Sequence, residues 1–138
     1  MEDNINYLDD IEILKEFLKE SNDHLDSIES KILTLKNCTD NLDIINSIFR
    51  SLHSIKGSSG FLDLQDICKV SHELETILDE TRKSKIKISP DIIETLYEGV
   101  DILRRLREIV VNKANNRNAS NDVINIYPLL LKISTILK

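Results

Sequence analysis

Apolar residues recur every three or four positions along most of this chain, which is the spacing of one face of an α-helix. The longest series steps by three and four from Ile11 to Leu35, with Ser21 as its one polar member. It predicts a single amphipathic helix over residues 9–36. The same spacing predicts further helices over residues 42–57, 63–83, 90–112 and 123–137.

The connections between these segments carry their own signals. Residues 37–41 interrupt the first apolar series. Ser89 followed by Pro90 is typical of a helix start, with the serine as the N-cap and the proline at the first helical position. Residues 113–121 are rich in asparagine and lack large apolar side chains, so they are interpreted as a linker.

The last apolar series has less sharp limits than the others. Pro128 lies inside it and leaves the start of the fifth helix open. The residues that step by three and four here are Val123, Ile126, Leu130, Ile133 and Leu137.

These helices predict the fold class. No alternation of apolar and polar residues competes with the helical period, and consecutive helices with short connections usually pack antiparallel. We therefore expect an all-α fold, an antiparallel four-helix bundle with an additional C-terminal fifth helix. The 138 residues are enough for one domain with its own core, so a single domain is expected over residues 1–138.

Composition narrows the class of protein. No apolar run approaches 18 residues and the first residues are acidic rather than a signal peptide, so we expect a cytoplasmic protein without membrane insertion. A net charge of −6 and an aromatic content of 4% disfavour nucleic acid as a partner. Cys38 and Cys68 make neither a disulfide framework nor a metal site. Other proteins are the expected partners.

The segment around His53 is where we expect the chemistry. Lys56 follows the histidine by three residues, and Gly57 and Gly60 lie at the fourth and seventh positions after it. Each glycine costs a helix interior about 1 kcal/mol relative to alanine, so two of them one turn apart need a reason other than local stability. Both fall on the stripe that runs from the imidazole toward the C-terminal end of the helix. We interpret this stripe as access for a partner to His53.

His53 lies at the edge of the apolar arc of its helix, next to Phe49, and a residue on the next helix is placed to meet it. Glu75 falls within the inward arc of the segment 63–83, where an isolated carboxylate would be costly. The nearest donors in sequence are His53 and Lys56. The sequence therefore predicts a hydrogen bond from His53 to Glu75.

Such a hydrogen bond has a chemical consequence. If Glu75 accepts from Nδ1–H, the neutral ring keeps a lone pair on Nε2, and the carboxylate stabilises the cationic ring that forms when Nε2 attacks phosphorus. The lysine at position 56 suits an anionic group such as phosphate. A satisfied structural contact between the histidine and the glutamate is the alternative interpretation.

Residues 52–64, with His53, Lys56, Gly57 and Gly60, resemble the motif of histidine phosphotransfer (HPt) domains. Within that family the chain is most similar to the N-terminal phosphotransfer domain of the chemotaxis histidine kinase CheA. Residues 71–82 and 17–21 are similar to further parts of that domain.

The resemblance implies a role for each matching residue. His53 would be the phosphoacceptor, Glu75 would orient and activate it, and Lys56 and His72 would be polar neighbours in that network. Gly57 and Gly60 would let a partner dock.

The resemblance also implies the partners. A histidine kinase catalytic domain would supply the phosphoryl group from ATP, and an aspartate of a response-regulator receiver domain would take it. No cofactor is expected in this chain, since ATP and Mg²⁺ would belong to the kinase or the receiver. Glycine occurs only at positions 57, 60 and 99, so no glycine-rich nucleotide box is present. The chain would be a domain of a longer kinase or a free-standing phosphotransfer protein.

Two other function classes stay open at this point. A carboxylate-bridged metal bundle would need glutamates three residues before histidines, but Ser21, Arg50 and Lys69 occupy those positions. A helical interaction module that binds a receiver or another protein without carrying phosphate is the second alternative. The basic residues 82–85 are interpreted as a solvated helix end without a function.

Overall fold

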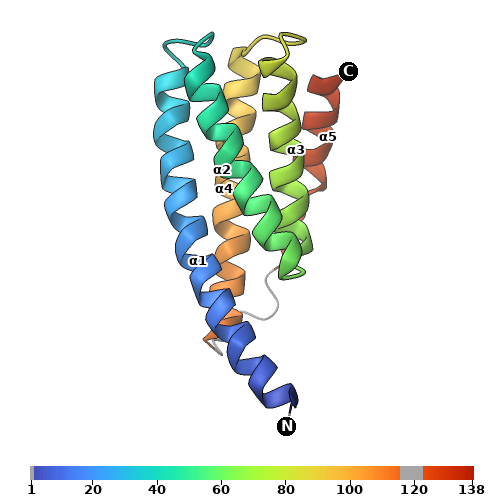
Figure 1. The fold of residues 1–138 in the computed structure, drawn as a ribbon. Helices are drawn as coiled ribbons and strands as arrows, with labels where there is room; N and C mark the ends of the chain where they lie inside the picture. The colour runs from blue at the N-terminus through green and yellow to red at the C-terminus, as the bar shows by residue number, and fades with distance from the viewer. Residues whose placement is uncertain (1, 116–122) are drawn as a thin grey trace.

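The computed structural model describes residues 2–115 and 123–138, with side chains from residue 11 onward. The described residues form helices and loops and contain no strand, which confirms the all-α prediction (Figure 1). The helices are α1 (Glu2–Leu35), α2 (Leu42–Phe61), α3 (Gln65–Arg82), α4 (Pro90–Ala114) and α5 (Tyr127–Leu137).

The first four helices make an antiparallel bundle, as predicted. Each packs on the next along the chain, and α1 also packs on α4, so the four helices enclose a common core. Helix α5 lies outside this ring against α3 and α4 (Figure 1). Helices α2 and α3 run side by side along one face of the bundle and hold the residues singled out above.

The core is aliphatic and follows the predicted helical faces. The apolar series of α1 is buried from Leu18 to Leu35, and Ser21 is buried with it because its hydroxyl donates to the carbonyl of Leu18 at 3.2 Å. The largest side chains with almost no exposure are Leu25, Ile28, Ile32, Leu35, Ile48, Leu52, Ile55, Leu74, Ile77, Leu78, Leu96 and Leu103. These residues come from all four bundle helices, so the bundle holds the α2–α3 face rigidly from behind.

The end of α2 differs from the prediction. The helix continues past Gly57 and Gly60 to Phe61, and neither glycine has a positive φ. The stop is Asp63, whose φ is 60° and whose neighbour Leu64 donates its N–H to the carbonyl of Ser59 at 2.8 Å. This left-handed residue with its six-to-one hydrogen bond ends the helix without glycine. Helix α3 therefore begins at 65 rather than 63.

The same device ends α3. Ser84 has a φ of 59°, and Lys85 donates its N–H to the carbonyl of Glu80 at 2.9 Å. The helix stops at Arg82, one residue before the predicted end at 83. At the start of α4 the prediction is confirmed, because the hydroxyl of Ser89 accepts from the N–H of Ile92 at 3.2 Å.

The limits of the first and last helices also need correction. Helix α1 begins at Glu2 rather than 9 and ends at Leu35. Helix α5 begins at Tyr127 instead of 123 because Pro128 fits the first turn, where no N–H is needed. Val123 is 88% exposed. Helix α5 buries Leu129 and Ile133, so the predicted face was correct at Ile133 but wrong at Leu130, because Leu129 is buried in its place.

The predicted linker begins later than expected. Helix α4 continues to Ala114, so residues 113 and 114 are helical and Asn115 caps the helix. Residues 116–121 of that prediction lie outside the described residues.

Gly99 is the glycine that the packing itself requires. It lies on α4 where that helix meets α3, and a Cβ built on it would fall 2.5 Å from Cδ1 and 2.8 Å from Cδ2 of Leu74. Leu74 is only 1% exposed and has little room to move away. Gly57 is the opposite case, since a Cβ there would meet no atom within 4 Å.

We expect Gly99→Ala to lower the free energy of unfolding by about 1 kcal/mol, because an overpacking cost of about 2 kcal/mol outweighs the helical gain of alanine of about 1 kcal/mol. Gly57→Ala is the matched control and should raise the free energy by about 1 kcal/mol. Urea unfolding followed by circular dichroism measures both. Equal changes in the two variants would contradict the close approach of α3 and α4.

Candidate functional site

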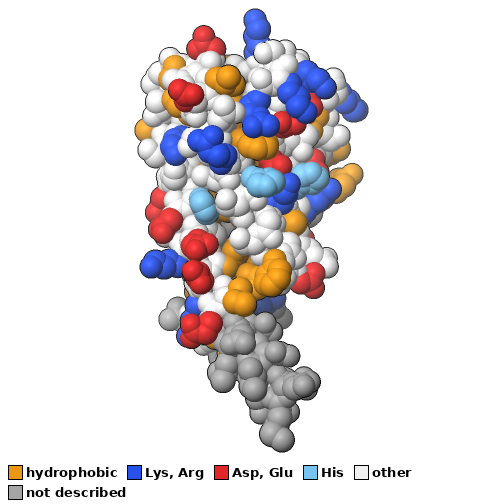
Figure 2. All heavy atoms as spheres, viewed as in Figure 1, with side chains coloured by type: hydrophobic (Ala, Val, Ile, Leu, Met, Phe, Trp, Pro, Cys, Tyr) orange, Lys and Arg blue, Asp and Glu red, His pale blue; other side chains and the backbone are white. Residues whose placement is uncertain are grey.

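His53 lies in the middle of α2 on the open side of the bundle. Its neighbour Leu52 is buried in the core, whereas 62% of the His53 side chain is exposed. Figure 2 shows that histidine side chains, with lysine and arginine side chains around them, gather on the face formed by α2 and α3. The imidazole is therefore held by a rigid helix and is open to solvent.

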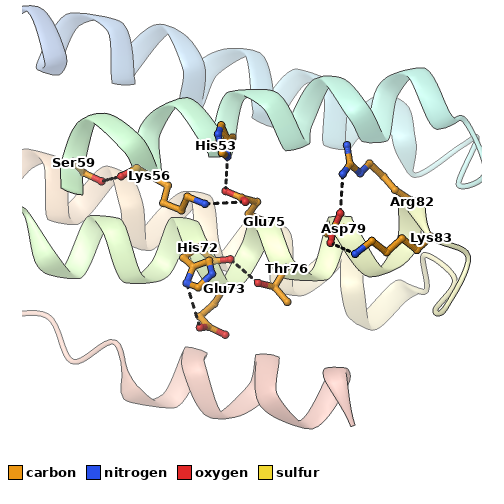
Figure 3. A network of polar contacts seen from close by, with 10 residues as sticks. All are labelled: His53, Lys56, Ser59, His72, Glu73, Glu75, Thr76, Asp79, Arg82 and Lys83. Atoms are coloured by element: carbon orange, nitrogen blue, oxygen red, sulfur yellow. Dashed lines mark hydrogen bonds and ion pairs between the residues drawn. The ribbon is translucent and has the colours of Figure 1, made fainter. Parts of the chain in front are cut away.

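Glu75 on α3 joins His53 and Lys56 into one cluster. Its Oε2 lies 3.3 Å from Nδ1 of His53, and its Oε1 accepts a hydrogen bond of 3.0 Å from Nζ of Lys56 (Figure 3). The predicted contact between His53 and Glu75 is confirmed. Both carboxylate oxygens are thus engaged by residues of the neighbouring helix.

The cluster follows from helical spacing and from charge. His53 and Lys56 are one turn apart, so both can reach the same point on α3. The Glu75 side chain is only 12% exposed, beside the fully buried Leu74 and Leu78. A carboxylate at such a depth needs donors, and the ammonium and the ring N–H provide them.

The hydrogen bond decides which ring nitrogen is available. With Nδ1–H donating to the carboxylate, the neutral imidazole has its lone pair on Nε2. A carboxylate at Nδ1 also stabilises the cationic ring that forms when Nε2 takes an electrophile. The arrangement can therefore act as an exposed nucleophile with an adjacent anionic support.

Gly57 and Gly60 carry no side chains, so the surface next to His53 is recessed. Neither is required by contacts within the chain, because a Cβ on Gly57 would meet open space and one on Gly60 would lie 3.4 Å from Sγ of Cys68, an ordinary contact. Together with Lys56 and His72 they line a shallow hollow of about 620 Å³ between α2 and α3. Local stability does not account for this low surface.

His72 borders the hollow beside Lys56, and its role as a polar neighbour of the network stays a prediction. Its side chain is 54% exposed, and its Nδ1 lies 4.0 Å from Oε1 of Glu73, whereas the Glu75 carboxylate points to His53 and Lys56 of α2 (Figure 3). Three residues advance a helix by about 300°, so His72 and Glu75 lie about 60° apart on the same side of α3. No hydrogen bond among the described residues joins His72 to His53, and its place is the edge of the hollow.

Phe49 and Arg82 form a second group beside His53, and of these two only Phe49 was expected there from the sequence. The Phe49 ring stacks on the His53 ring, with 6.1 Å between centroids and 15° between planes. The guanidinium carbon of Arg82 lies 3.8 Å from the centroid of Phe49. Arg82, which was interpreted as part of a solvated helix end, is therefore in contact with the site. The sequence signal that pointed to this contact was the presence of an arginine in the last turn of α3.

Asp79 holds this end of α3 together. Its Oδ2 lies 2.8 Å from Nζ of Lys83, and its Oδ1 accepts from Arg82 at 2.7 Å (Figure 3). These hydrogen bonds, that of Lys83 first, hold the pKa of the Asp79 carboxyl below its ordinary value. The same contact raises the pKa of Lys83. Asp79 therefore stays ionised at neutral pH and restrains Arg82.

Two further properties concern the described residues as a whole. They contain no group of three or more His, Cys, Asp or Glu side chains close enough to hold a metal ion. Within the same residues, no helix has both the length and the apolar character needed to cross a membrane.

The chain has relatives among known proteins. The family model described as "Hpt domain" matches residues 12–111. The sensor histidine kinase CheAY of Helicobacter pylori is 33% identical over 112 residues, which cover 80% of this chain and 14% of that kinase. The chain thus spans about one seventh of the length of that relative.

Two solved structures share the fold. The CheA phosphotransferase domain from Thermotoga maritima has 36% identity and a TM-score of 0.67, covering 72% of this chain and 96% of that one. A solution structure of the histidine phosphotransfer domain of CheA has 30% identity and a TM-score of 0.79, with 91% of each chain covered. Both are single phosphotransfer domains rather than whole kinases.

Proposed function

Because the chain belongs to the Hpt domain family, we propose that it is the phosphotransfer domain of a two-component relay of the chemotaxis type. A histidine kinase catalytic domain phosphorylates His53, and the phosphoryl group then passes to an aspartate of a response-regulator receiver domain. The kinase and the receiver are the protein partners. The chain carries the group and does not turn over a substrate by itself.

One observation supports this role above the others. The exposed His53 ring has its Nδ1 3.3 Å from Oε2 of the buried Glu75. A purely structural histidine would gain most from burial with both nitrogens satisfied. Here 62% of the side chain that carries Nε2 is exposed.

The first transfer uses the lone pair of Nε2. This nitrogen attacks the γ-phosphorus of ATP, a P–N bond forms, the bond to the β,γ-bridging oxygen breaks, and ADP leaves with that electron pair. The ring becomes cationic while Nδ1 keeps its proton, and the Glu75 carboxylate stabilises that charge. Lys56 holds the other oxygen of Glu75 at 3.0 Å and so keeps the carboxylate in place.

The second transfer reverses the bond at nitrogen. A carboxylate oxygen of the receiver's aspartate attacks the phosphorus, the P–N bond breaks, and the electron pair returns to Nε2. The products are an acyl phosphate on the receiver and the neutral ring of His53, still hydrogen-bonded to Glu75. We assign ATP and Mg²⁺ to the kinase and the receiver, and the reaction to the cytoplasm, where ATP is available.

His53→Gln is expected to abolish phosphorylation, because glutamine keeps a polar side chain but has no ring nitrogen to attack phosphorus. The measurement is acid-labile phosphate on the chain after incubation with ATP and a CheA-type kinase core that lacks its own phosphotransfer domain. His24→Gln is a matched control, since His24 lies on α1, and it should be labelled like the wild type.

Equal label on wild type and His53→Gln would move the acceptor to His72 or His24. No label on either protein, with the fold intact and several kinase cores tried, would contradict phosphotransfer. That result would favour a helical interaction module that binds a receiver without carrying phosphate.

Glu75→Ala is expected to slow phosphorylation of His53 by about tenfold to a hundredfold, the effect of losing a hydrogen bond to a charged group. The bundle should stay folded, because alanine removes the buried charge, and the His53 and Lys56 side chains that lose their partner are 62% and 26% exposed and can bind water instead. Glu73→Ala removes a carboxylate from the same helix that contacts Lys69 and His72 instead, and it is the control. Rates that match between Glu75→Ala and wild type would exclude the proposed role of Glu75.

Gly57→Leu is expected to slow transfer from the kinase core by about tenfold or more, because a large side chain would fill the low surface that a docking domain needs. Open space around Gly57 means that the variant should fold. Phosphoramidate, a small donor that needs no docking surface, should label Gly57→Leu and wild type at similar rates. Slower labelling by both donors would show instead that the substitution disturbs His53 itself.

A further inference from the structure

We propose that Phe49, held by Arg82, is a positioning residue that fixes the plane of the His53 ring. This inference rests on the proposed function of His53 as a phosphoacceptor. Glu75 favours the Nδ1–H tautomer only while Nδ1 faces its carboxylate, and Phe49 holds the ring in that orientation. The two contacts together keep Nε2 directed at solvent.

Helical geometry brings Phe49 and His53 together. The two residues are four positions apart on α2, so they lie on the same face one turn from each other. Side chains on a helix lean toward its N-terminal end, so the His53 ring leans over Phe49. The nearly parallel rings, 15° apart in plane and 6.1 Å apart in centroid, are the result.

A hydrogen bond alone does not fix this ring. The contact between Nδ1 and Glu75 is 3.3 Å long, and most of the His53 side chain faces solvent. One hydrogen bond at one ring atom still allows the ring to rotate about the direction of that hydrogen bond. Contact with a ring face opposes this rotation, and Phe49 is the aromatic residue that supplies it.

Phe49 is itself held from α3. The Arg82 guanidinium lies over the Phe49 ring at 3.8 Å from its centroid, a cation–π geometry. Arg82 donates to Oδ1 of Asp79 at 2.7 Å, and Asp79 also pairs with Lys83. The guanidinium is therefore restrained by both Phe49 and Asp79. As a result, this face of the Phe49 ring packs against a fixed group rather than against water.

The arrangement links the two helices at two levels. Glu75 and Arg82 are seven residues apart on α3, which places them on one face two turns apart. Phe49 and His53 lie opposite them on α2. The His53 ring is thus bounded by the carboxylate of Glu75, with Lys56 on its second oxygen, and by the aromatic face that Arg82 supports.

The first test reads the ring directly. Nitrogen NMR of the neutral imidazole should show the Nδ1–H tautomer of His53 in the wild-type protein. Phe49→Leu keeps an apolar side chain without a ring, and its Nδ1–H fraction should fall, whereas Phe49→Tyr should restore it. Phe61→Leu, which changes an exposed phenylalanine of the same helix, is the control. An unchanged tautomer in Phe49→Leu would overturn the proposal.

The second test separates positioning from docking. With phosphoramidate, the bond from phosphorus to ammonia breaks as the bond to Nε2 forms, and no protein surface is needed. Phe49→Leu should be labelled about fivefold more slowly than wild type by this donor, and Arg82→Ala should show a smaller loss in the same direction. Arg105→Ala, which removes a guanidinium from a surface pair on α4, should label normally.

The outcomes distinguish this inference from the proposed function. Slower labelling of Phe49→Leu by the kinase core alone, with the phosphoramidate rate unchanged, would make Phe49 a docking residue and overturn the positioning role. A wild-type chain that no kinase core labels, but whose His53 tautomer depends on Phe49, would contradict the proposed function and leave the positioning of the ring supported.

Discussion

The site depends on a carboxylate buried between two helices. Glu75 lies in the packed contact of α2 with α3, where an ionised group without donors would be strongly unfavourable. Its two oxygens are therefore satisfied by the ring of His53 and the ammonium of Lys56, and these contacts orient both side chains. The need to satisfy one buried charge thus sets the direction of the exposed His53 ring.

The remaining helices provide the frame for this contact. α1 and α4 close the bundle behind α2 and α3, and the aliphatic core leaves those helices little freedom to shift. A ring nitrogen placed to within an ångström requires such a frame, because reactivity falls steeply with misplacement. The glycines beside His53 lower the surface where a second protein would have to approach.

Local rules predicted most of the fold and the centre of the site. The three-and-four spacing found the bundle helices, and the inward position of Glu75 was enough to predict its partner, because a buried carboxylate in a helical protein has few donors within reach. The left-handed residues that end α2 and α3, Asp63 and Ser84, were missed. Non-glycine residues seldom adopt this conformation, and the sequence carries no signal for it at these two positions. Sequence patterns favour glycine as the residue that ends a helix, but here Gly57 and Gly60 both lie within α2.

Other features depended on tertiary packing. The contact of Arg82 with Phe49 joins distant positions, and only the register of α2 against α3 brings them together. The apolar residues of α5 fit more than one helical face, and its contacts with α3 and α4 selected the face of Leu129. His72 was assigned to the network by resemblance, and the ionic contact that it makes among the described residues is with Glu73.

The close approach at Gly99 has a consequence for the depth of the Glu75 carboxylate. Leu74, which fits against Gly99, immediately precedes Glu75 in α3. The missing methyl group on α4 lets α3 settle inward at this level, and the backbone that carries Glu75 settles with it. A glycine on the far side of the helix thus helps to determine how much of the carboxylate water can reach, and through it how firmly the histidine is held.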